Sequence, residues 1–315
     1  MNRRHRQVVK TPPFHGGFVG SNPAGVTNVD ICFSQYRSSS AFVDVLIFFR
    51  IEAPPMKNLL RSMHRWMNDY IKSFYSDDPE VQQGIEIKET HTGYVTANCI
   101  ELAHYLKFDE HDTNLAEIIG LFHDVGRFRQ YSLYKTFNDA QSEDHADLGL
   151  KVIDELDFFD QLPADDLKLI RFAIGQHNKK DIAPTDDQRQ LLFAKLIRDA
   201  DKLDIYRVLE PFLAQENAHK MPKFIKGRER PDISPDFVEN FIEGRQADYR
   251  QIRTNGDRKI VRLMWVYNVN FAWTMRKIVE RGYIDKIVDA LPMDEKVELG
   301  VRRLRDYVQR VCQSD

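Results

Sequence analysis

The chain has 315 residues, enough to bury a substantial core in one large domain or two modest ones. Its 45 basic and 48 acidic residues give a formal net charge of −3, which argues against a general attraction to nucleic acid or to an anionic membrane. Cys32, Cys99 and Cys312 are far apart and form no CxxC pair, so we expect no disulfide framework and no zinc knuckle. No run approaches the ~20 apolar residues that cross a bilayer. We therefore expect a cytoplasmic protein with reduced thiols.

Residues 1–55 differ in pattern from the rest of the chain. They combine paired prolines, paired glycines and three consecutive serines with little helical periodicity. We interpret this segment as a disordered extension or a misassigned start. The alternative is a small appendage containing a strand over residues 42–51.

Beyond Met56 the apolar residues recur every three or four positions, which is the period of an amphipathic helix. Alternating strand pairs and internal repeats are absent from this part of the sequence. Gly126 marks one of the breaks, and we expect it to close a helix. We predict an all-α fold with helices over residues 57–75, 92–107, 114–124, 145–156, 165–177, 188–210, 235–251, 257–281, 283–289 and 294–312.

A basic segment broken by Pro and Gly, residues 220–235, is interpreted as a loop between two helical parts. We expect a catalytic domain over residues 56–215 and a C-terminal helical part over residues 216–315 that packs on it. The C-terminal part is rich in aromatic residues, which we expect to fill its core or to form the face of a homo-oligomer; a lid over the active site is the minority interpretation. These aromatic residues are Trp265, Tyr267, Phe271 and Trp273.

Several histidines lie on the apolar faces of the predicted helices. His91 opens one helix a turn before its first buried position, and His123-Asp124 ends another. His145 starts a third helix, and His177 continues the apolar stripe of a fourth. An inward aspartate beside an inward histidine is costly without a partner, and a metal ion supplies one.

An acidic cluster lies within the predicted helix at 188–210. Asp201 comes four residues after Ile197 and lies on the apolar stripe, whereas Asp204 lies near its edge and Asp199 points away. Helical geometry therefore favours Asp201 as the buried carboxylate, with Asp204 as the second choice. Five helices then direct imidazole or carboxylate groups to one interior. Such a donor set suits Mn, Fe, Co, Ni or Zn, and Mg less well.

These residues resemble the H…HD…D signature of the HD superfamily of metal-dependent phosphohydrolases. The flanking sequences fit as well: Gly-Leu-Phe-His-Asp-Val-Gly-Arg-Phe at 120–128, Asp-His-Ala-Asp-Leu-Gly at 144–149 and Arg-Asp-Ala-Asp-Lys-Leu-Asp at 198–204. The likeness spans residues from near 85 to near 210. It implies an HD-domain helical bundle around a central metal site, with additional C-terminal helices.

The resemblance also implies roles for individual residues. The four signature residues would hold one divalent ion, and His145 and His177 look like the additional ligands of a binuclear subgroup, with Asp124 bridging. Metal-activated water would hydrolyse a phosphomonoester or phosphodiester of a small metabolite or nucleotide, with Asp201 or a nearby carboxylate orienting the water. The metal ligands implied are His91, His123, Asp124, His145, His177 and Asp201.

Cations near this site are expected to meet the substrate phosphate. Arg127, three residues after Asp124, is the best placed, and Lys179 and Lys180 follow His177 directly. We therefore expect a catalytic set of Asp124, Asp201 and Arg127, with Arg127 and the two lysines binding substrate.

Other functions remain open at this stage. Some HD proteins with a similar ligand set use two irons to activate oxygen, and iron content with oxygen consumption would distinguish them. A non-catalytic HD signalling or binding module is the second alternative, although an intact ligand set argues against it. A nucleic-acid enzyme is disfavoured by the near-neutral net charge. We expect a small phosphorylated substrate and no membrane partner.

Overall fold

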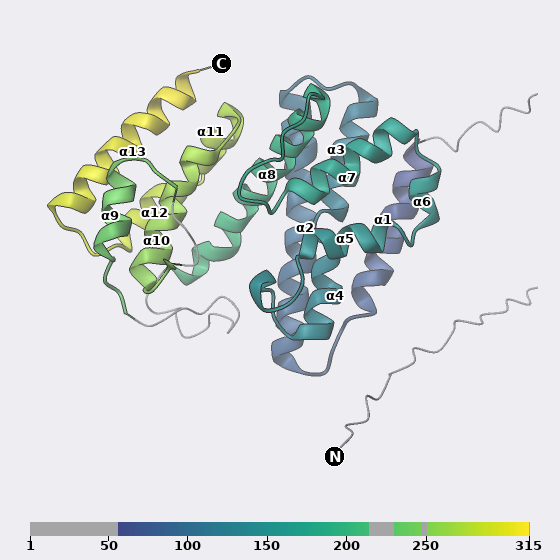
Figure 1. The fold of residues 1–315 in the computed structure, drawn as a ribbon, viewed down its shortest axis with the longest axis horizontal. Helices are drawn as coiled ribbons and strands as arrows, with labels where there is room; N and C mark the ends of the chain where they lie inside the picture. Colours follow the sequence, from purple (N-terminus) through teal and green to yellow (C-terminus); the bar gives the residue numbers. More distant parts are fainter. Residues whose placement is uncertain (1–55, 214–229, 247–250, 315) are drawn as a thin grey trace, which may run out of the picture. The chain divides into compact units, whose positions relative to one another are not determined.

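The computed structural model describes residues 56–213, 230–246 and 251–314, and every regular element within these ranges is a helix (Figure 1). The all-α prediction is confirmed. The predicted extension at 1–55 and most of the predicted loop at 220–235 lie outside the described residues. Among the helices described, none is long and apolar enough to cross a bilayer.

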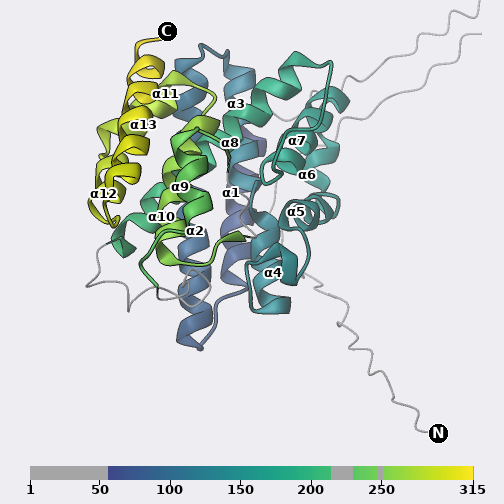
Figure 2. The ribbon, with the colours of Figure 1, turned by 60° about the vertical axis from the view of Figure 1, so that its left-hand side comes forward.

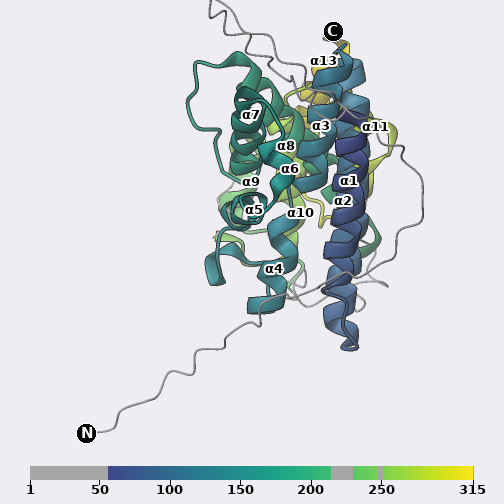
Figure 3. The same ribbon diagram turned by 90° about the vertical axis from the view of Figure 1, so that its right-hand side faces the viewer.

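The N-terminal bundle is organised around its two longest helices, α2 and α8. Helix α2 packs along both α3 and α8, α1 covers α3, and α7 lies against α8 and α5 (Figure 3). The helices of this bundle are α1 (Met56–Lys72), α2 (Pro79–Tyr105), α3 (Glu110–Phe122), α4 (Val125–Tyr134), α5 (His145–Ile153), α6 (Asp157–Asp160), α7 (Ala164–Gln176) and α8 (Gln188–Leu209).

Helix α2 begins much earlier than the sequence pattern indicated. The predicted start at residue 92 is wrong because the apolar period is weak before it, while a cap at residue 78 sets the true beginning. The Asp78 carboxylate accepts hydrogen bonds from the amides of Glu80 and Val81, and Pro79 occupies the first helical position. His91 consequently lies in the middle of α2 and is held by helix on both sides.

Gly126 does not close a helix, contrary to expectation. Helix α3 ends at Phe122, and α4 starts at Val125 after the non-helical residue Asp124. Gly126 lies in the first turn of α4, where a Cβ atom would stand 2.3 Å from the carbonyl oxygen of His145 and 2.5 Å from the amide nitrogen of Gly149. The missing side chain lets α4 and α5 approach backbone to backbone, which brings His145 towards Asp124.

The C-terminal helices form their own packed group next to α8 (Figure 2). Helix α13 packs against α9 and α11, α10 lies against α9 and α12, and α11 also contacts α8 and α2. Trp265 packs on Tyr206 and Tyr267 on Tyr307, with ring centroids 5.6 and 4.8 Å apart. The helices are α9 (Pro235–Ile242), α10 (Asn255–Met264), α11 (Ala272–Glu280), α12 (Tyr283–Asp289) and α13 (Glu295–Gln313).

Two predicted helices of this part are interrupted in the structure. Helix α9 stops at Ile242 because Gly244 adopts a left-handed φ of 64°, and the Arg245 amide donates back to the Asn240 carbonyl at 2.9 Å. The predicted helix at 257–281 breaks between α10 and α11, where the Asp199 carboxylate accepts the backbone amides of residues 270 and 271. Asp199, expected to point away, is thus fully buried.

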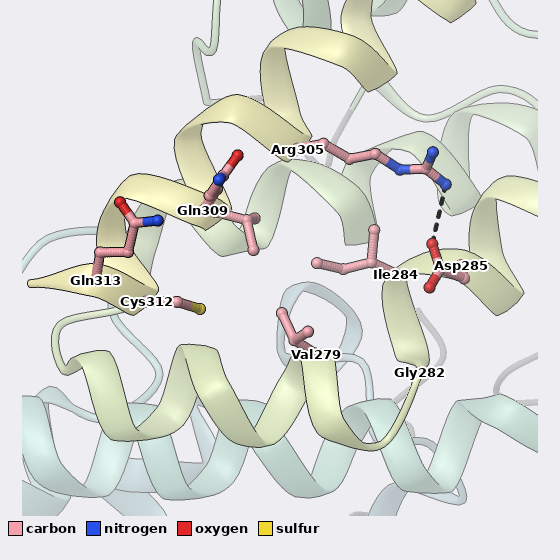
Figure 4. A pocket seen from close by; sticks show the side chains of 9 residues that line it. Val279, Gly282, Ile284, Asp285, Arg305, Gln309, Cys312 and Gln313 are labelled. Carbon is pink, nitrogen blue, oxygen red and sulfur yellow. Dashed lines mark hydrogen bonds and ion pairs between the residues drawn. The ribbon is translucent and has the colours of Figure 1, made fainter.

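A cavity of about 420 Å³ lies between α11, α12 and α13 (Figure 4). Its walls are largely aliphatic, and at its rim Arg305 forms an ion pair with Asp285 at 2.9 Å. The residues that line it are Val279, Gly282, Ile284, Asp285, Arg305, Val308, Gln309, Cys312 and Gln313. None of them is a histidine or aspartate that the sequence analysis assigned to the metal site.

The close approach at Gly126 leads to a direct test. Gly126→Ala should lower the free energy of unfolding by about 1–3 kcal/mol, since the new methyl group meets backbone atoms that cannot rotate away. Gly93→Ala is the matched control, because a Cβ at that exposed position of α2 has no neighbour within 4 Å. Alanine should there raise stability by about 0.5–1 kcal/mol. Urea unfolding measures both, and equal effects would contradict the packing described.

Candidate metal centre

Three side chains form the first ligand cluster, defined here as His91, His123 and Asp201. They come from α2, from the end of α3 and from α8. Nε2 of His91 lies 3.1 Å from Oδ1 of Asp201 and 3.3 Å from Nε2 of His123. Both imidazoles are buried, whereas the Asp201 side chain keeps 18% of its surface exposed. The cluster is therefore closed on the histidine side and reachable at the carboxylate.

The second ligand cluster is defined as Asp124, His145 and His177. Asp124 links α3 to α4, His145 starts α5, and His177 follows the last residue of α7. The Nε2 atoms of the two histidines are 3.0 Å apart. Each of these three residues is at least 94% buried. None of them is therefore an ordinary solvent-exposed polar residue, and each needs a partner inside the protein.

Asp124 faces both clusters with different oxygen atoms. Its Oδ2 lies 3.5 Å from Nε2 of His91 and 3.6 Å from Nε2 of His123. Its Oδ1 lies 3.4 Å from Nε2 of His145 and 3.7 Å from Nε2 of His177. One carboxylate thus lies between two histidine pairs, and each of its oxygen atoms faces one pair.

The four histidines share one orientation, with Nε2 facing the clusters and Nδ1 hydrogen-bonded outside them. Nδ1 of His123 donates to the carbonyl of Gly120 at 2.8 Å, and Nδ1 of His177 donates to the carbonyl of Ile174 at 2.7 Å. A carbonyl only accepts, so these imidazoles carry their proton on Nδ1 and present a lone pair from Nε2. Metal-binding histidines are held in this way by their outer hydrogen bonds.

The spacing of the nitrogen atoms fits a shared ion. Two imidazole nitrogens that bind one ion at about 2.0–2.1 Å, with an angle of about 90–110° between them, are about 2.8–3.4 Å apart. The observed separations of 3.3 Å for His91 and His123 and of 3.0 Å for His145 and His177 fall in this range. Facing lone pairs repel each other unless a cation or a proton lies between them. The two clusters therefore suit divalent metal binding.

Comparison with known families agrees with this geometry. The HD domain family matches residues 89–206, a segment that includes every ligand named above. Residues 89–206 are an HD domain. No curated protein and no solved structure was found that matches the chain.

A lysine that was not among the predicted site residues, Lys88, contacts Asp124 and directly precedes the matched segment. The Lys88 ammonium donates to Oδ2 of Asp124 at 2.6 Å, and its side chain is 17% exposed. Lys88 lies one helical turn before His91 on α2, so the i, i+3 spacing was the signal that could have revealed it. This ammonium is one of the groups that stabilise the negative charge of the buried carboxylate.

The three residues predicted to bind substrate, Arg127, Lys179 and Lys180, differ in how close they lie to the ligand clusters. Arg127 lies beside Asp124, with Nε at 3.6 Å, but its Nη1 donates to Gln130, to the Phe137 carbonyl and to Asp139. The Lys179 ammonium is paired with two carboxylates of the α5 start, at 2.7 and 3.3 Å. Lys180 is exposed. Arg127 is thus the member of the set that reaches the metal centre.

Two further carboxylates lie behind the ligands. Oδ2 of Asp204 is 2.6 Å from Nδ1 of His91, and Oδ2 of Asp139 is 2.6 Å from Nδ1 of His145. Asp204, the second choice for a ligand on α8, therefore contacts the outer face of His91, while Asp201 faces the cluster. Asp139 was not foreseen, because the segment between α4 and α5 has no periodicity that would fix its direction.

Burial and hydrogen bonding shift the pKa values of His91, His123 and His145 in different directions. Burial lowers the pKa of His123 to about 3 and that of His145 to about 4. Burial also acts on His91, but hydrogen bonds to Asp201 and Asp204 outweigh it and raise its pKa. The pKa of Asp124 is held well below its ordinary value despite burial, because Lys88 and His123 favour the anion.

These shifts predict a pH-dependent stability for the metal-free protein. Unfolded histidine titrates near 6.5, whereas His123 and His145 stay neutral in the fold down to about 3 and 4. The unfolded chain therefore binds more protons below pH 6.5. Each histidine should lower the free energy of unfolding by about 1.4 kcal/mol per pH unit between about pH 6 and 4. Urea unfolding of chelator-treated protein at several pH values measures this slope.

The same experiment has an internal control. His123→Gln removes one of the two buried neutral imidazoles and should reduce the acid slope by about half. The raised pKa of His91 acts in the other direction, because the stability it contributes is lost as the pH rises above 6.5. A stability that stays constant or increases from pH 6 to pH 4 would contradict the burial of these histidines.

Proposed function

We propose that this protein is a metal-dependent phosphohydrolase that cleaves a phosphomonoester or phosphodiester of a small metabolite or nucleotide. The observation that carries the proposal is Asp124, whose two oxygen atoms face two separate histidine pairs at 3.4 to 3.7 Å. Two ions that share a carboxylate suit the attacking and leaving oxygens of phosphoester hydrolysis. HD domains are typical of metal-dependent hydrolases, which supports the reaction class.

The chemistry divides between the ions and the chain. Bound divalent ions supply a water of lowered pKa and neutralise charge on the phosphate group. Asp201 is the ligand with the most accessible side chain, at 18% against 1% for His91 and 0% for His123. Its carboxylate can accept a hydrogen bond from an entering water and orient it, while the buried histidines hold the ions.

Lys88 is the residue proposed to meet the substrate phosphate. Its ammonium donates to Oδ2 of Asp124 and would compete with a bound cation for this carboxylate. With ions held by the two clusters, this ammonium would be available to donate to the anionic oxygens of a bound phosphoester. Arg127 shares the neighbourhood, but its Nη1 is engaged by three acceptors.

The metal centre is tested first by ligand substitution. His123→Ala and His177→Ala should each lower the bound metal from two ions per chain towards one, and Asp124→Ala should abolish both. Hydrolysis of p-nitrophenyl phosphate or bis-p-nitrophenyl phosphate with Mn, Co, Ni or Mg should fall more than about 100-fold, since outer-shell changes alone cost 10–100-fold. His104→Ala, at an exposed position of the same helix as His91, is the matched control and should change neither quantity.

Elemental analysis of protein purified without chelators separates the alternatives. Two ions and hydrolysis that fall together in the ligand variants support the proposal. If the protein binds two iron ions, consumes oxygen and hydrolyses no phosphoester, it is an oxygen-activating enzyme and the phosphohydrolase proposal is wrong. Absence of metal after reconstitution with each ion would refute the catalytic proposal and leave a helical binding protein.

The role of Lys88 has its own test. Lys88→Ala should raise KM for the phosphoester about 10-fold, since one charged hydrogen bond to the phosphate contributes about 1.5 kcal/mol. It should leave metal content intact, because the lysine opposes the ions at Asp124 and does not bind them. Lys179→Ala should change KM less, since the Lys179 ammonium is already paired with Asp144 and Asp147. Loss of metal in Lys88→Ala would contradict this role.

A further inference from the structure

Each histidine pair of the metal centre has one member supported by a backbone carbonyl and one supported by a carboxylate. In the first cluster, His123 donates to the Gly120 carbonyl and His91 faces Asp204. In the second pair, His177 donates to the Ile174 carbonyl and His145 faces Asp139. Both carbonyls belong to the residue three positions before the histidine they support.

The carboxylates behind His91 and His145 are each joined to an arginine. Nε and Nη2 of Arg207 donate to the two oxygens of Asp204 at 2.5 and 3.0 Å. Nη1 of Arg127 donates to Oδ1 of Asp139 at 2.9 Å. The result is a His–Asp–Arg chain behind each of the two ligand clusters, and the chains have no residue in common.

Both arginines are themselves held in place. The Arg207 guanidinium lies 4.0 Å from the centre of the Tyr94 ring, a cation–π contact that also orients its plane. Arg127 donates to Gln130 and to the Phe137 carbonyl, and Gln130 in turn donates to Asp139 at 2.8 Å. Gln130 is fully buried, so its hydrogen bond to Asp139 anchors the segment that carries this carboxylate.

The carboxylates paired with these arginines determine where the proton of His91 and that of His145 lies. A guanidinium can only donate hydrogen bonds, so it favours the ionised form of the carboxylate beside it. An ionised carboxylate can only accept hydrogen bonds. The facing Nδ1 of the histidine must then donate, which leaves Nε2 with a lone pair directed at the cluster. The backbone carbonyls impose the same proton position on His123 and His177 without a charge.

We propose that Asp204 with Arg207, and Asp139 with Arg127, are two independent positioning pairs, each fixing the metal-binding form of one histidine for one ion. The inference rests on the proposed two-ion function of the site. Arg127 then acts through Asp139 and His145 and is a positioning residue. Because the chains are separate, breaking one should weaken the binding of one ion and leave the affinity for the other unchanged.

Asparagine and alanine substitutions distinguish this role from a merely structural one. In Asp204→Asn, the arginine claims the amide oxygen and the NH₂ group faces Nδ1 of His91. That nitrogen must then accept, so the proton moves to Nε2 and blocks the ion. Asp204→Ala removes the contact without forcing the wrong proton position. Asparagine should therefore lower metal affinity more than alanine, the reverse of the order expected from lost packing alone.

The measurement is titration of the full chain with Mn²⁺, followed by electron paramagnetic resonance. Asp204→Asn in a His177→Ala background should weaken binding of the remaining ion about 10–100-fold, whereas in a His123→Ala background it should have no effect. Asp139→Asn should show the opposite dependence on background. Unfolding curves for each variant verify that the bundle is intact.

The chain contains a matched control for these substitutions. His111, Asp166 and Arg189 form a third His–Asp–Arg chain, with His111 Nε2 2.9 Å and Arg189 Nη1 3.2 Å from Asp166. None of these three residues belongs to a ligand cluster. Asp166→Asn should therefore leave Mn²⁺ affinity unchanged while removing the same type of contact.

The possible outcomes separate this inference from the function on which it rests. Wild-type protein that binds no Mn²⁺ would overturn both. Two Mn²⁺ ions in the wild type, with affinity unchanged in Asp204→Asn and Asp139→Asn, would overturn the positioning pairs alone. Equal loss of both ions in each variant, or a larger effect of alanine than of asparagine, would do the same. Hydrolysis need not be detected for any of these results.

Discussion

The Asp124 carboxylate, buried between two pairs of histidines, is the constraint on which the rest of this structure depends. An anion so far from water requires cations or hydrogen-bond donors on both oxygens. The fold meets this requirement by bringing α2, α3, α5, α7 and α8 to one point and by placing Lys88 within 2.6 Å of it. The same need makes the site receptive to divalent ions, which offer more charge than one ammonium.

Three of the four histidines of the metal centre, His123, His145 and His177, lie at the ends of helices. His123 and His177 follow the last residues of α3 and α7, where a carbonyl of the preceding turn accepts a hydrogen bond from Nδ1. His145 starts α5, and Gly126 allows α4 and α5 to approach closely enough to bring it beside Asp124. Terminal positions thus give the histidines both a defined direction and a hydrogen-bond partner.

Sequence reasoning predicted the helical class and the convergence of the ligand residues because buried faces repeat with the helical period. It failed where local contacts override that period. Asp199 was expected to face away, but it accepts two backbone amides that would otherwise continue a helix. The supports of the site were also hidden: Asp139 lies in a segment without periodicity, and Lys88 resembles any surface lysine until its partner 36 residues away is known.

The proposal that two ions share Asp124 can be tested by an anomalous-scattering map from crystals of the full chain grown with Mn²⁺. We expect two peaks, one on each side of this carboxylate. The first should lie among His91, His123 and Asp201, and the second against His145 and His177. A single peak, no peak, or peaks elsewhere in the protein would contradict it.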